Sequence, residues 1–348
     1  NTPLRDALTE AISLKLLELS PLRDGYMPIG KMIDEKSFVN AIVGLLATGG
    51  STNHTIHLIA MARSCGITLS WDDFDTLSSI VPLLCRMYPN GSADVNHFHS
   101  AGGMAVVIKE LLDAGLLHED VNTVMGYGLK NYLKEPFLKD GKLVYKDSIE
   151  TSADTSVISS VKKPFDIQGG LRVLDGNIGR CVIKTSALKD DNRIINAPAK
   201  VFYSQEALKE AFSKGELNSD FIAVLPYQGP KSNGMPELHG LMPSMGALQD
   251  NGFKVAIVTD GRMSGASGKV ASAIHLCPEA KDGGVIAKII DGDMITMNCD
   301  DGSLVLHVAE DELQKRQINL PDLSGNMYGV GRELFSMMRK VVNSAEEG

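Results

Sequence analysis

The chain has 348 residues, of which 43% are hydrophobic and 22% are charged, so it can bury a substantial core and is long enough for two domains. Its 34 lysine and arginine residues against 43 aspartate and glutamate residues give a formal net charge of −9, which disfavours nucleic acid or an anionic membrane surface as the main partner. The sequence contains neither an apolar run of about eighteen residues nor a secretory signal, so we expect a soluble, cytoplasmic protein.

The first half of the chain is predicted to be mainly helical. Residues 51–53 offer N-cap chemistry to a helix that ends at Gly66, and a second helix is expected between Gly103 and Gly115. The polar segment 148–164 is predicted to be a linker because it combines Ser, Thr and Asp with two lysines and ends at a proline.

The second half is predicted to contain short strands punctuated by glycine, which favours a barrel or sandwich-like domain with inserted helices. Helices are expected over residues 206–214 and 311–316, and an amphipathic helix over 331–342 is expected to close the chain. The predicted strands cover residues 171–174, 181–185, 200–203, 221–225, 255–259, 285–289, 295–297 and 304–308.

The five cysteines are scattered and form no C-x-x-C pair, so a zinc knuckle or a ferredoxin-type run is not expected. They are predicted to be reduced and mostly buried. The histidine pairs 54/57 and 97/99 lack a third ligand at usable spacing, which disfavours a metal site at either pair.

Two glycine-rich loops, over residues 229–237 and 260–269, each follow a predicted buried strand. Such loops can turn backbone N–H groups toward an anion, although their glycines can equally serve only to close tight turns. Neither loop matches a P-loop fingerprint, and the sequence has no G-x-S-x-G nucleophile elbow. Ser264, between Arg262 and Gly265, can act as an activated hydroxyl only if nearby positive charge or a metal lowers its pKa.

A series of motifs then follows in order along nearly the whole chain, over residues 48–53, 71–74, 101–103, 109–112, 169–171, 182–185, 229–231, 234–237, 259–265 and 278–280. Together they resemble the family of dihydroxy-acid and phosphogluconate dehydratases. Within that family, residues 29–36, 88–98 and 229–234 look closest to the branch that acts on 6-phosphogluconate. The dihydroxy-acid branch usually carries alanine where this chain has His54.

The resemblance implies dehydration of 6-phospho-D-gluconate to 2-dehydro-3-deoxy-6-phosphogluconate plus water, a step of the Entner–Doudoroff pathway. A base removes the C2 proton and the C3 hydroxyl leaves with the help of a Lewis acid. Two alternatives stay open: a dehydratase for a dihydroxy acid or another sugar acid, and a cluster-free paralogue that binds anions or partners.

The resemblance also assigns residues. The catalytic base of the family's Arg-x-Ser-Gly motif falls on Ser264, and the Mg²⁺ ligand of its Gly-Met-Pro-Glu motif falls on Glu237. Substrate contacts are expected at Arg262, Lys231, Lys269 and Asn53.

The family's iron–sulfur cluster, expected to be 4Fe-4S, has ligands with no counterpart among the five cysteines of this chain. We therefore predict that the chain is the C-terminal part of a longer homodimeric enzyme and is inactive alone. The family fold implies that residues 1–165 are the remainder of an N-terminal α/β domain. Residues 166–348 are then a swivelling β-barrel-like (β/β/α) domain that carries Ser264.

Overall fold

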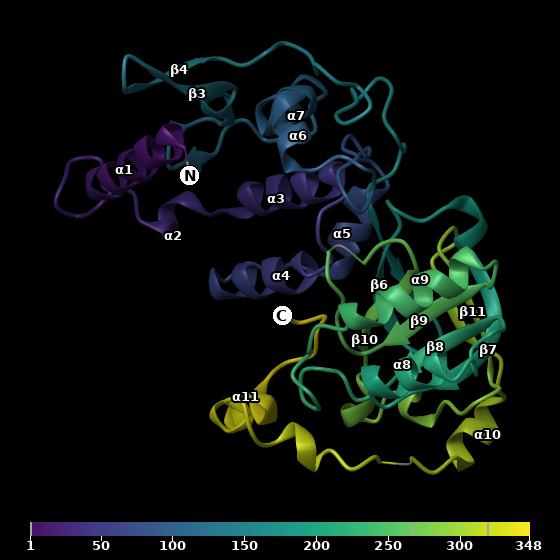
Figure 1. Ribbon diagram of the computed structural model, residues 1–348. Coiled ribbons are helices and arrows are strands. Elements are labelled where there is room, and N and C mark those ends of the chain that lie inside the picture. The colour runs from purple at the N-terminus through teal and green to yellow at the C-terminus, as the bar shows by residue number, and fades with distance from the viewer. Residues whose placement is uncertain (1, 266, 319) are drawn as a thin grey trace.

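The computed structural model describes residues 2–265, 267–318 and 320–348, and it shows a helical half followed by a strand-rich half (Figure 1). The helical half consists, in chain order, of α1 (Pro3–Glu18), α2 (Ile29–Met32), α3 (Glu35–Thr48), α4 (His54–Ser64), α5 (Trp71–Ser78), α6 (Val95–Ser100), α7 (Gly103–Asp113), β1 (Asn122–Thr123), β2 (Gly126–Tyr127), β3 (Lys134–Lys139) and β4 (Lys142–Asp147).

Helix α3 illustrates how local sequence starts and ends these helices. The Asp34 side chain accepts a hydrogen bond from the backbone N–H of Ser37 at 2.8 Å, which satisfies a donor that the helix itself leaves unpaired. Gly49 ends the helix with a φ of 59°, a left-handed conformation that glycine adopts without a steric penalty. Between these caps the helix buries one apolar face, which includes Phe38, Ile42 and Leu46.

The strand-rich half consists of β5 (Leu171–Leu174), β6 (Arg180–Lys184), β7 (Ile194–Val201), α8 (Gln205–Ser213), β8 (Phe221–Leu225), α9 (Met242–Asp250), β9 (Val255–Thr259), β10 (Ala271–Cys277), β11 (Met294–Asn298), β12 (Ser303–Leu306), α10 (Glu310–Lys315) and α11 (Ser336–Val341). Its strands form one sheet in the order β12-β11-β7-β8-β9-β10-β6-β5. The four central strands, from β7 to β10, are parallel, and the outer pairs are antiparallel.

The two edges of this sheet meet. The backbone N–H of Asp175 donates to the carbonyl of Gly302 at 2.8 Å, and the carbonyl of Asp175 accepts from Leu304 at 3.0 Å. These bonds satisfy backbone groups that an open edge leaves unpaired, so the sheet forms a nearly closed barrel. The predicted mixed α/β architecture with a β-barrel-like second half is confirmed.

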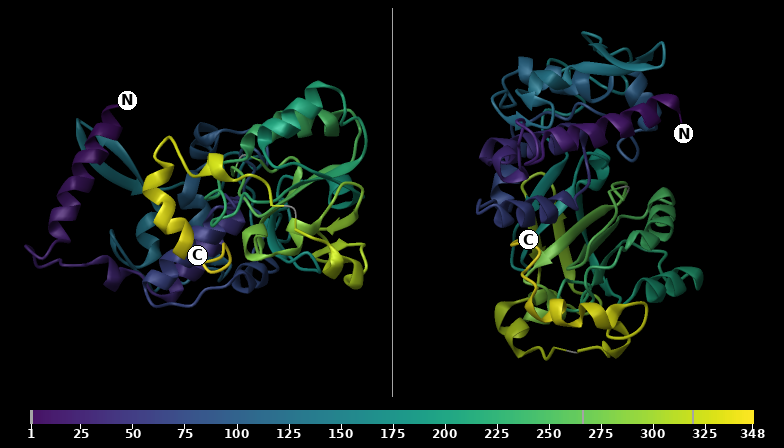
Figure 2. Two further views of the ribbon diagram at one scale, coloured as in Figure 1. Left: turned by 90° about the horizontal axis from the view of Figure 1, so that it is seen from below. Right: turned by 90° about the vertical axis from the view of Figure 1, so that its left-hand side faces the viewer.

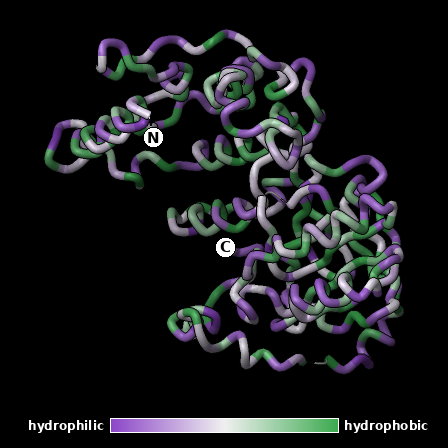
Figure 3. The backbone as a smooth tube through the Cα atoms, in the orientation of Figure 1, coloured by the Kyte–Doolittle hydropathy of each residue, from purple (hydrophilic) through white to green (hydrophobic). Residues whose placement is uncertain are grey.

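The central strands β8, β9 and β10 are buried along their whole length, and many green, hydrophobic segments lie in the barrel half of the tube in Figure 3. In β8, Ile222 and Val224 contribute to the cluster inside the barrel, whereas Phe221, Ala223 and Leu225 belong to the cluster outside it. This alternation follows from the two-residue period of a strand. The outer cluster also contains residues of α3, α5, α8 and α9, so one continuous core joins the helical half to the barrel.

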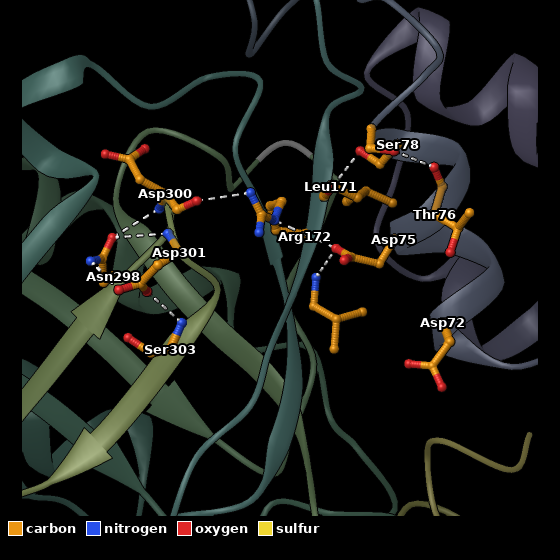
Figure 4. Close-up of polar contacts among 12 residues, drawn as sticks. Asp72, Asp75, Thr76, Ser78, Leu171, Arg172, Asn298, Asp300, Asp301 and Ser303 are labelled. Atoms are coloured by element: carbon orange, nitrogen blue, oxygen red, sulfur yellow. Dashed lines mark hydrogen bonds and ion pairs between the residues drawn. The ribbon is translucent and has the colours of Figure 1, made fainter.

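Polar contacts reinforce this junction at β5 (Figure 4). The Asp75 carboxylate of α5 accepts the backbone N–H of Val173 at 2.9 Å, and Arg172 lies 3.5 Å from the same carboxylate. Arg172 also donates to the carbonyl of Asp300, in the turn between β11 and β12, at 3.1 Å. Helix α5, strand β5 and the barrel closure are therefore tied together through one arginine.

The segment after β12 runs along the outside of the barrel and returns to the helical half (Figures 1 and 2). Arg180 of β6 forms salt bridges with Glu346 at 2.6 Å and with Asp72 of α5. Arg63 of α4 donates to the carbonyl of Glu347 at 3.3 Å. The last residues thus contact both halves of the molecule.

The structure agrees with most predicted strands and corrects others. Strands over residues 171–174, 221–225 and 255–259 are confirmed. Residues 285–288 instead form a 3₁₀ turn, in which the N–H of Ala287 bonds to the carbonyl of Gly284. Strand β10 was not predicted because its alanine, serine and histidine residues give a weak strand pattern, and its burial between β9 and β6 is what defines it.

The predicted closing helix over 331–342 is shorter than expected: a 3₁₀ turn (Arg332–Phe335) precedes the six-residue α11. Of the cysteines, Cys65 is exposed and the other four are buried, and all five are free thiols, as predicted. Among the described residues, no helix is long and apolar enough to cross a membrane.

Candidate functional site

The two glycine-rich loops lie side by side because they follow neighbouring parallel strands. Strands β8 and β9 pair in parallel, so their carboxyl ends reach the same edge of the sheet. The N–H of Leu238 then donates to the carbonyl of Arg262 at 3.2 Å, and Glu237 and Arg262 form a short parallel bridge. The chain thereby brings two segments that the sequence analysis singled out into direct contact.

Glu237 and Arg262 form an ion pair in which Nη1 of Arg262 lies 2.7 Å from Oε2 of Glu237. Nε of Arg262 donates to the carbonyl of Met235 at 2.8 Å, so the guanidinium holds the whole turn that presents Glu237. Both side chains are about one-third exposed, at 33% for Arg262 and 39% for Glu237, which leaves the pair accessible to a ligand.

Ser264 follows Arg262 by two residues, at the point where the second glycine-rich loop approaches the turn between α3 and α4. It lines a narrow space of about 10 Å³ together with Thr52, Lys184 and Ser267. The approach is close, because a Cβ added to Gly265 would lie 2.8 Å from Cβ of Ser51. A common ligand for Ser264 and Glu237 stays a prediction.

Lys184, at the end of β6, is the cation of this narrow space, and its role was not predicted. Its Nζ donates to the carbonyls of Gly49 at 2.8 Å, Gly50 at 3.2 Å and Gly265 at 3.0 Å. The side chain is buried, and burial lowers its pKa to about 8. Lys184 therefore connects the end of α3 to the residue that follows Ser264.

Two histidines also lie near the Ser264 loop without having been predicted. Nδ1 of His239 lies 2.7 Å from the hydroxyl of Ser267. His275 is fully buried in β10, with its Nδ1 3.3 Å from the hydroxyl of Thr55. Burial, aided by the charges of Arg262 and His57, lowers the pKa of His275 to about 3, so its imidazole is neutral at physiological pH.

Asp260 and Glu279 form an acidic pair beneath the loops. Asp260 accepts the backbone N–H groups of Gln228 at 2.8 Å, Ala280 at 2.9 Å and Tyr227 at 3.1 Å. Burial outweighs these hydrogen bonds and raises the pKa of Asp260 to about 6. Burial, followed by repulsion from Asp260, raises the pKa of Glu279 to about 8.

The backbone amides of the first loop are already used within the protein. The N–H of Lys231 donates to both oxygens of Glu279, at 3.0 and 3.2 Å. The N–H groups of Asn233 and Gly234 donate to the carbonyl of Gly229, and that of Met235 to Gln228. These four amides do not form an anion cradle; they shape the loop itself.

The structure places the other predicted substrate contacts in different surroundings. Lys231 pairs with Asp282 at 2.6 Å, and Lys269 pairs with Asp250 at the end of α9 at 2.8 Å. Asn53 immediately precedes α4, and its side-chain oxygen is buried with no hydrogen-bond partner among the described residues. Their contact with a substrate stays a prediction.

The described side chains of this region offer too few ligands for a metal ion. Among the residues that the structure describes, no group of three or more His, Cys, Asp or Glu side chains is placed to hold a metal ion. Glu237 offers one carboxylate, which is paired with Arg262. The described residues alone therefore complete neither a Mg²⁺ site nor a cluster site.

Comparison with known proteins places this architecture in a class. Residues 156–348 match the family model "Dihydroxy-acid/6-phosphogluconate dehydratase C-terminal", and residues 1–132 match the corresponding N-terminal model. The chain belongs to the dihydroxy-acid/6-phosphogluconate dehydratase family, as the resemblance of its motifs predicted.

Individual relatives show how similar the chain is to the two kinds of dehydratase in the family. The chain is 56% identical over 348 residues to the phosphogluconate dehydratase of Escherichia coli K12 and 52% identical to that of Pseudomonas aeruginosa, in each case over its whole length. It is 38% identical over 290 residues, or 82% of its length, to the dihydroxy-acid dehydratase of Prochlorococcus marinus. The chain spans 58% of the E. coli relative, 57% of the P. aeruginosa relative and 49% of the P. marinus relative.

Proposed function

We propose that the complete protein is a hydro-lyase that converts 6-phospho-D-gluconate to 2-dehydro-3-deoxy-6-phosphogluconate plus water, within the Entner–Doudoroff pathway. The observation that carries this proposal is similarity to phosphogluconate dehydratases over the whole chain, which includes the loops of Ser264 and Glu237. The 38% identity to a dihydroxy-acid dehydratase makes dehydration of a dihydroxy acid the second candidate.

In the proposed reaction, Ser264 takes the proton from C2. The electrons of the broken C2–H bond form a C2=C3 double bond while the C3–O bond breaks. The proton lost from C2 and the hydroxide lost from C3 together account for the water that is released. The resulting enol tautomerises to the 2-keto acid as its hydroxyl proton moves to C3.

A serine hydroxyl accepts a proton at neutral pH only if its surroundings favour the alkoxide. The position of Lys184 supports this role, because its ammonium bonds to the carbonyl of Gly265 and lines the same narrow space as Ser264. A fixed positive charge stabilises negative charge more strongly where water is excluded.

Glu237 and Arg262 are proposed to bind the carboxylate end of the substrate, Glu237 as a ligand of Mg²⁺ and Arg262 directly. Lys231, Lys269 and Asn53 are retained as further candidate contacts. The iron–sulfur cluster, with the remaining Mg²⁺ ligands, is proposed to be held by residues outside this chain, so the chain alone would be inactive.

We also propose a domain organisation and an oligomeric state for the complete protein. Residues 1–165 would complete an α/β domain, and residues 166–348 would form a domain that swivels relative to it. The continuous core between helices and barrel indicates that any such motion includes the helices packed on the barrel. A homodimer in the cytoplasm is the expected state.

The test compares turnover of 6-phosphogluconate and 2,3-dihydroxyisovalerate by the complete gene product, purified anaerobically. We expect 6-phosphogluconate to be dehydrated with a much higher kcat/KM. Equal or faster turnover of the dihydroxy acid would reject the proposed substrate. A colourless, iron-free preparation after reconstitution would instead favour a binding protein without a cluster.

A further inference from the structure

A cavity of about 460 Å³ lies between the first glycine-rich loop and the segment that follows β12. The loop contributes Asn233, Gly234 and Met235, and the later segment contributes Arg332 and Arg339. The two segments are about a hundred residues apart in the sequence, so only the tertiary structure forms this cavity. We refer to it as the arginine cavity.

The arginine side chains are fixed against the loop. Nη1 of Arg332 donates to the side-chain oxygen of Asn233 at 2.8 Å, and Nη2 of Arg339 donates to the carbonyl of Arg332 at 3.0 Å. Cδ of Arg339 lies 4.0 Å from the position that a Cβ on Gly234 would take. Nε of Arg339 is buried and has no hydrogen-bond partner among the described residues.

These arginines differ from the other cations of the loops in one respect. Lys231, Arg262 and Lys269 each pair with a carboxylate. Neither Arg332 nor Arg339 forms a salt bridge with any carboxylate that the structure describes. Two partly buried guanidinium groups that pair with no described carboxylate, in a chain of net charge −9, are suited to binding an anionic ligand.

The two guanidinium groups, set in an otherwise largely apolar lining, favour a phosphate monoester. Guanidinium groups present parallel N–H donors that match the oxygens of phosphate, and two such groups complement its double negative charge. The same loop continues from Met235, which lines the cavity, to Glu237. Nε of Arg262 also donates to the carbonyl of Met235 at 2.8 Å, so the Glu237–Arg262 pair adjoins a residue that lines the cavity.

We propose that Arg332 and Arg339 bind the phosphate of the sugar-acid substrate while Glu237 and Arg262 face its carboxylate end. This inference rests on the proposed function, and it assigns the phosphate to residues other than Lys231 and Lys269. Because phosphate and carboxylate occupy opposite ends of the substrate, the cavity also selects against acids that carry no phosphate.

The test uses Arg339→Met, Arg332→Met and the double variant of the complete gene product. The matched control is Lys340→Met, which removes the same charge from the adjacent exposed residue that does not line the cavity. We expect each arginine variant to raise KM for 6-phosphogluconate roughly tenfold to a hundredfold, since a hydrogen bond to a charged group contributes about one to two factors of ten. The kcat value for 6-phosphogluconate should stay within about twofold.

If circular dichroism shows that the methionine variants fail to fold, KM is measured instead with Arg339→Gln, which keeps a polar side chain. An unchanged KM in the folded double variant, or an equal change in Lys340→Met, would overturn the proposal.

Direct binding of inorganic phosphate, measured by calorimetry, separates this inference from the proposed function. If the wild-type protein does not dehydrate 6-phosphogluconate, the proposed reaction fails. Loss of phosphate binding in the arginine variants alone would still support the cavity as a phosphate site. Failure of the wild type to bind phosphate, or equal binding by the arginine variants, would reject it.

Discussion

Lys184 carries a positive charge in a place where its three hydrogen-bond acceptors are neutral carbonyl oxygens. The ammonium group therefore fixes the positions of these three carbonyls and contributes the electrostatic field of its charge, but it forms no salt bridge with a described carboxylate. It holds Gly49 and Gly50, after α3, against Gly265, after Ser264. A lysine at the end of an apolar strand gives no such signal in the sequence, because its three partners come from two distant segments.

Lys184→Met is expected to lower kcat about tenfold or more, because the Ser264 loop loses the donor that fixes Gly265. Lys200→Met is the matched control, since Lys200 also donates to a carbonyl, that of Glu216 at 2.8 Å, but on an exposed surface. As pH rises through about 8, the pKa of Lys184, the wild-type rate should fall with the loss of its charge, and this inflection should be absent in the methionine variant. An equal decrease in both variants would contradict this role.

Ser264→Ala is expected to reduce kcat by roughly two to four orders of magnitude, the contribution of a positioned general base. Chemical unfolding should show little change in stability, because the change removes one oxygen from a partly exposed loop residue. Ser213→Ala, in which an exposed helical serine loses its bond to the carbonyl of Lys209, is the comparison. Retained turnover in Ser264→Ala would reject serine as the base.

At the scale of the elements, the parallel pairing of β8 and β9 is what assembles the candidate site. Their carboxyl ends bring both glycine-rich loops to one edge, above the buried pair Asp260 and Glu279. The sequence predicted both strands and both loops, because each strand is a largely apolar run that is followed within four residues by glycine. It did not predict the acidic pair, since Glu279 follows β10, the strand that was missed.

The elevated pKa values of this pair predict how stability depends on pH. Glu279 is protonated in the native state up to about pH 8, whereas in the unfolded chain it ionises near 4.5. The native state thus binds more protons in between, and the free energy of unfolding should fall as pH rises from about 4.5 to 8.

Glu279→Gln should flatten this decrease and stabilise the protein at pH 8 by on the order of 1–3 kcal/mol, because the buried side chain no longer ionises. Urea unfolding between pH 5 and 8.5 measures the effect, with the exposed Glu206→Gln as control. A wild-type protein whose stability is constant over this range would contradict the prediction.

At the scale of the whole molecule, the barrel closes where Asp175 bridges the two edge strands, and Gly176 follows directly. A Cβ at residue 176 would lie 1.9 Å from the carbonyl oxygen of Leu304, so only glycine fits against the neighbouring backbone. The glycine was visible in the sequence, but its partner, more than a hundred residues later, was not.

Gly176→Ala is therefore expected to destabilise the protein by about 1–3 kcal/mol, the usual cost of overpacking, as the barrel edges separate. Gly44→Ala, inside α3 and with no atom of another described residue outside the local helix backbone within 4 Å of the added Cβ, should instead leave stability unchanged or raise it by up to about 1 kcal/mol. Urea unfolding of both variants measures the difference. Equal stabilities would show that the closure does not require glycine at this position.

The sequence alone determined the features that depend on neighbouring residues: the helices α4 and α7, the apolar strands β8 and β9, the glycine-rich loops, and the ordered motifs that identify the family. Only the tertiary structure decided which charges are neutralised, because Lys231, Arg262 and Lys269 pair with carboxylates whereas Arg332 and Arg339 pair with none in the described part of the chain. Periodicity and turn chemistry are encoded over a few residues, but ion pairing and burial are set by the register of the closed barrel, which joins segments far apart in the chain.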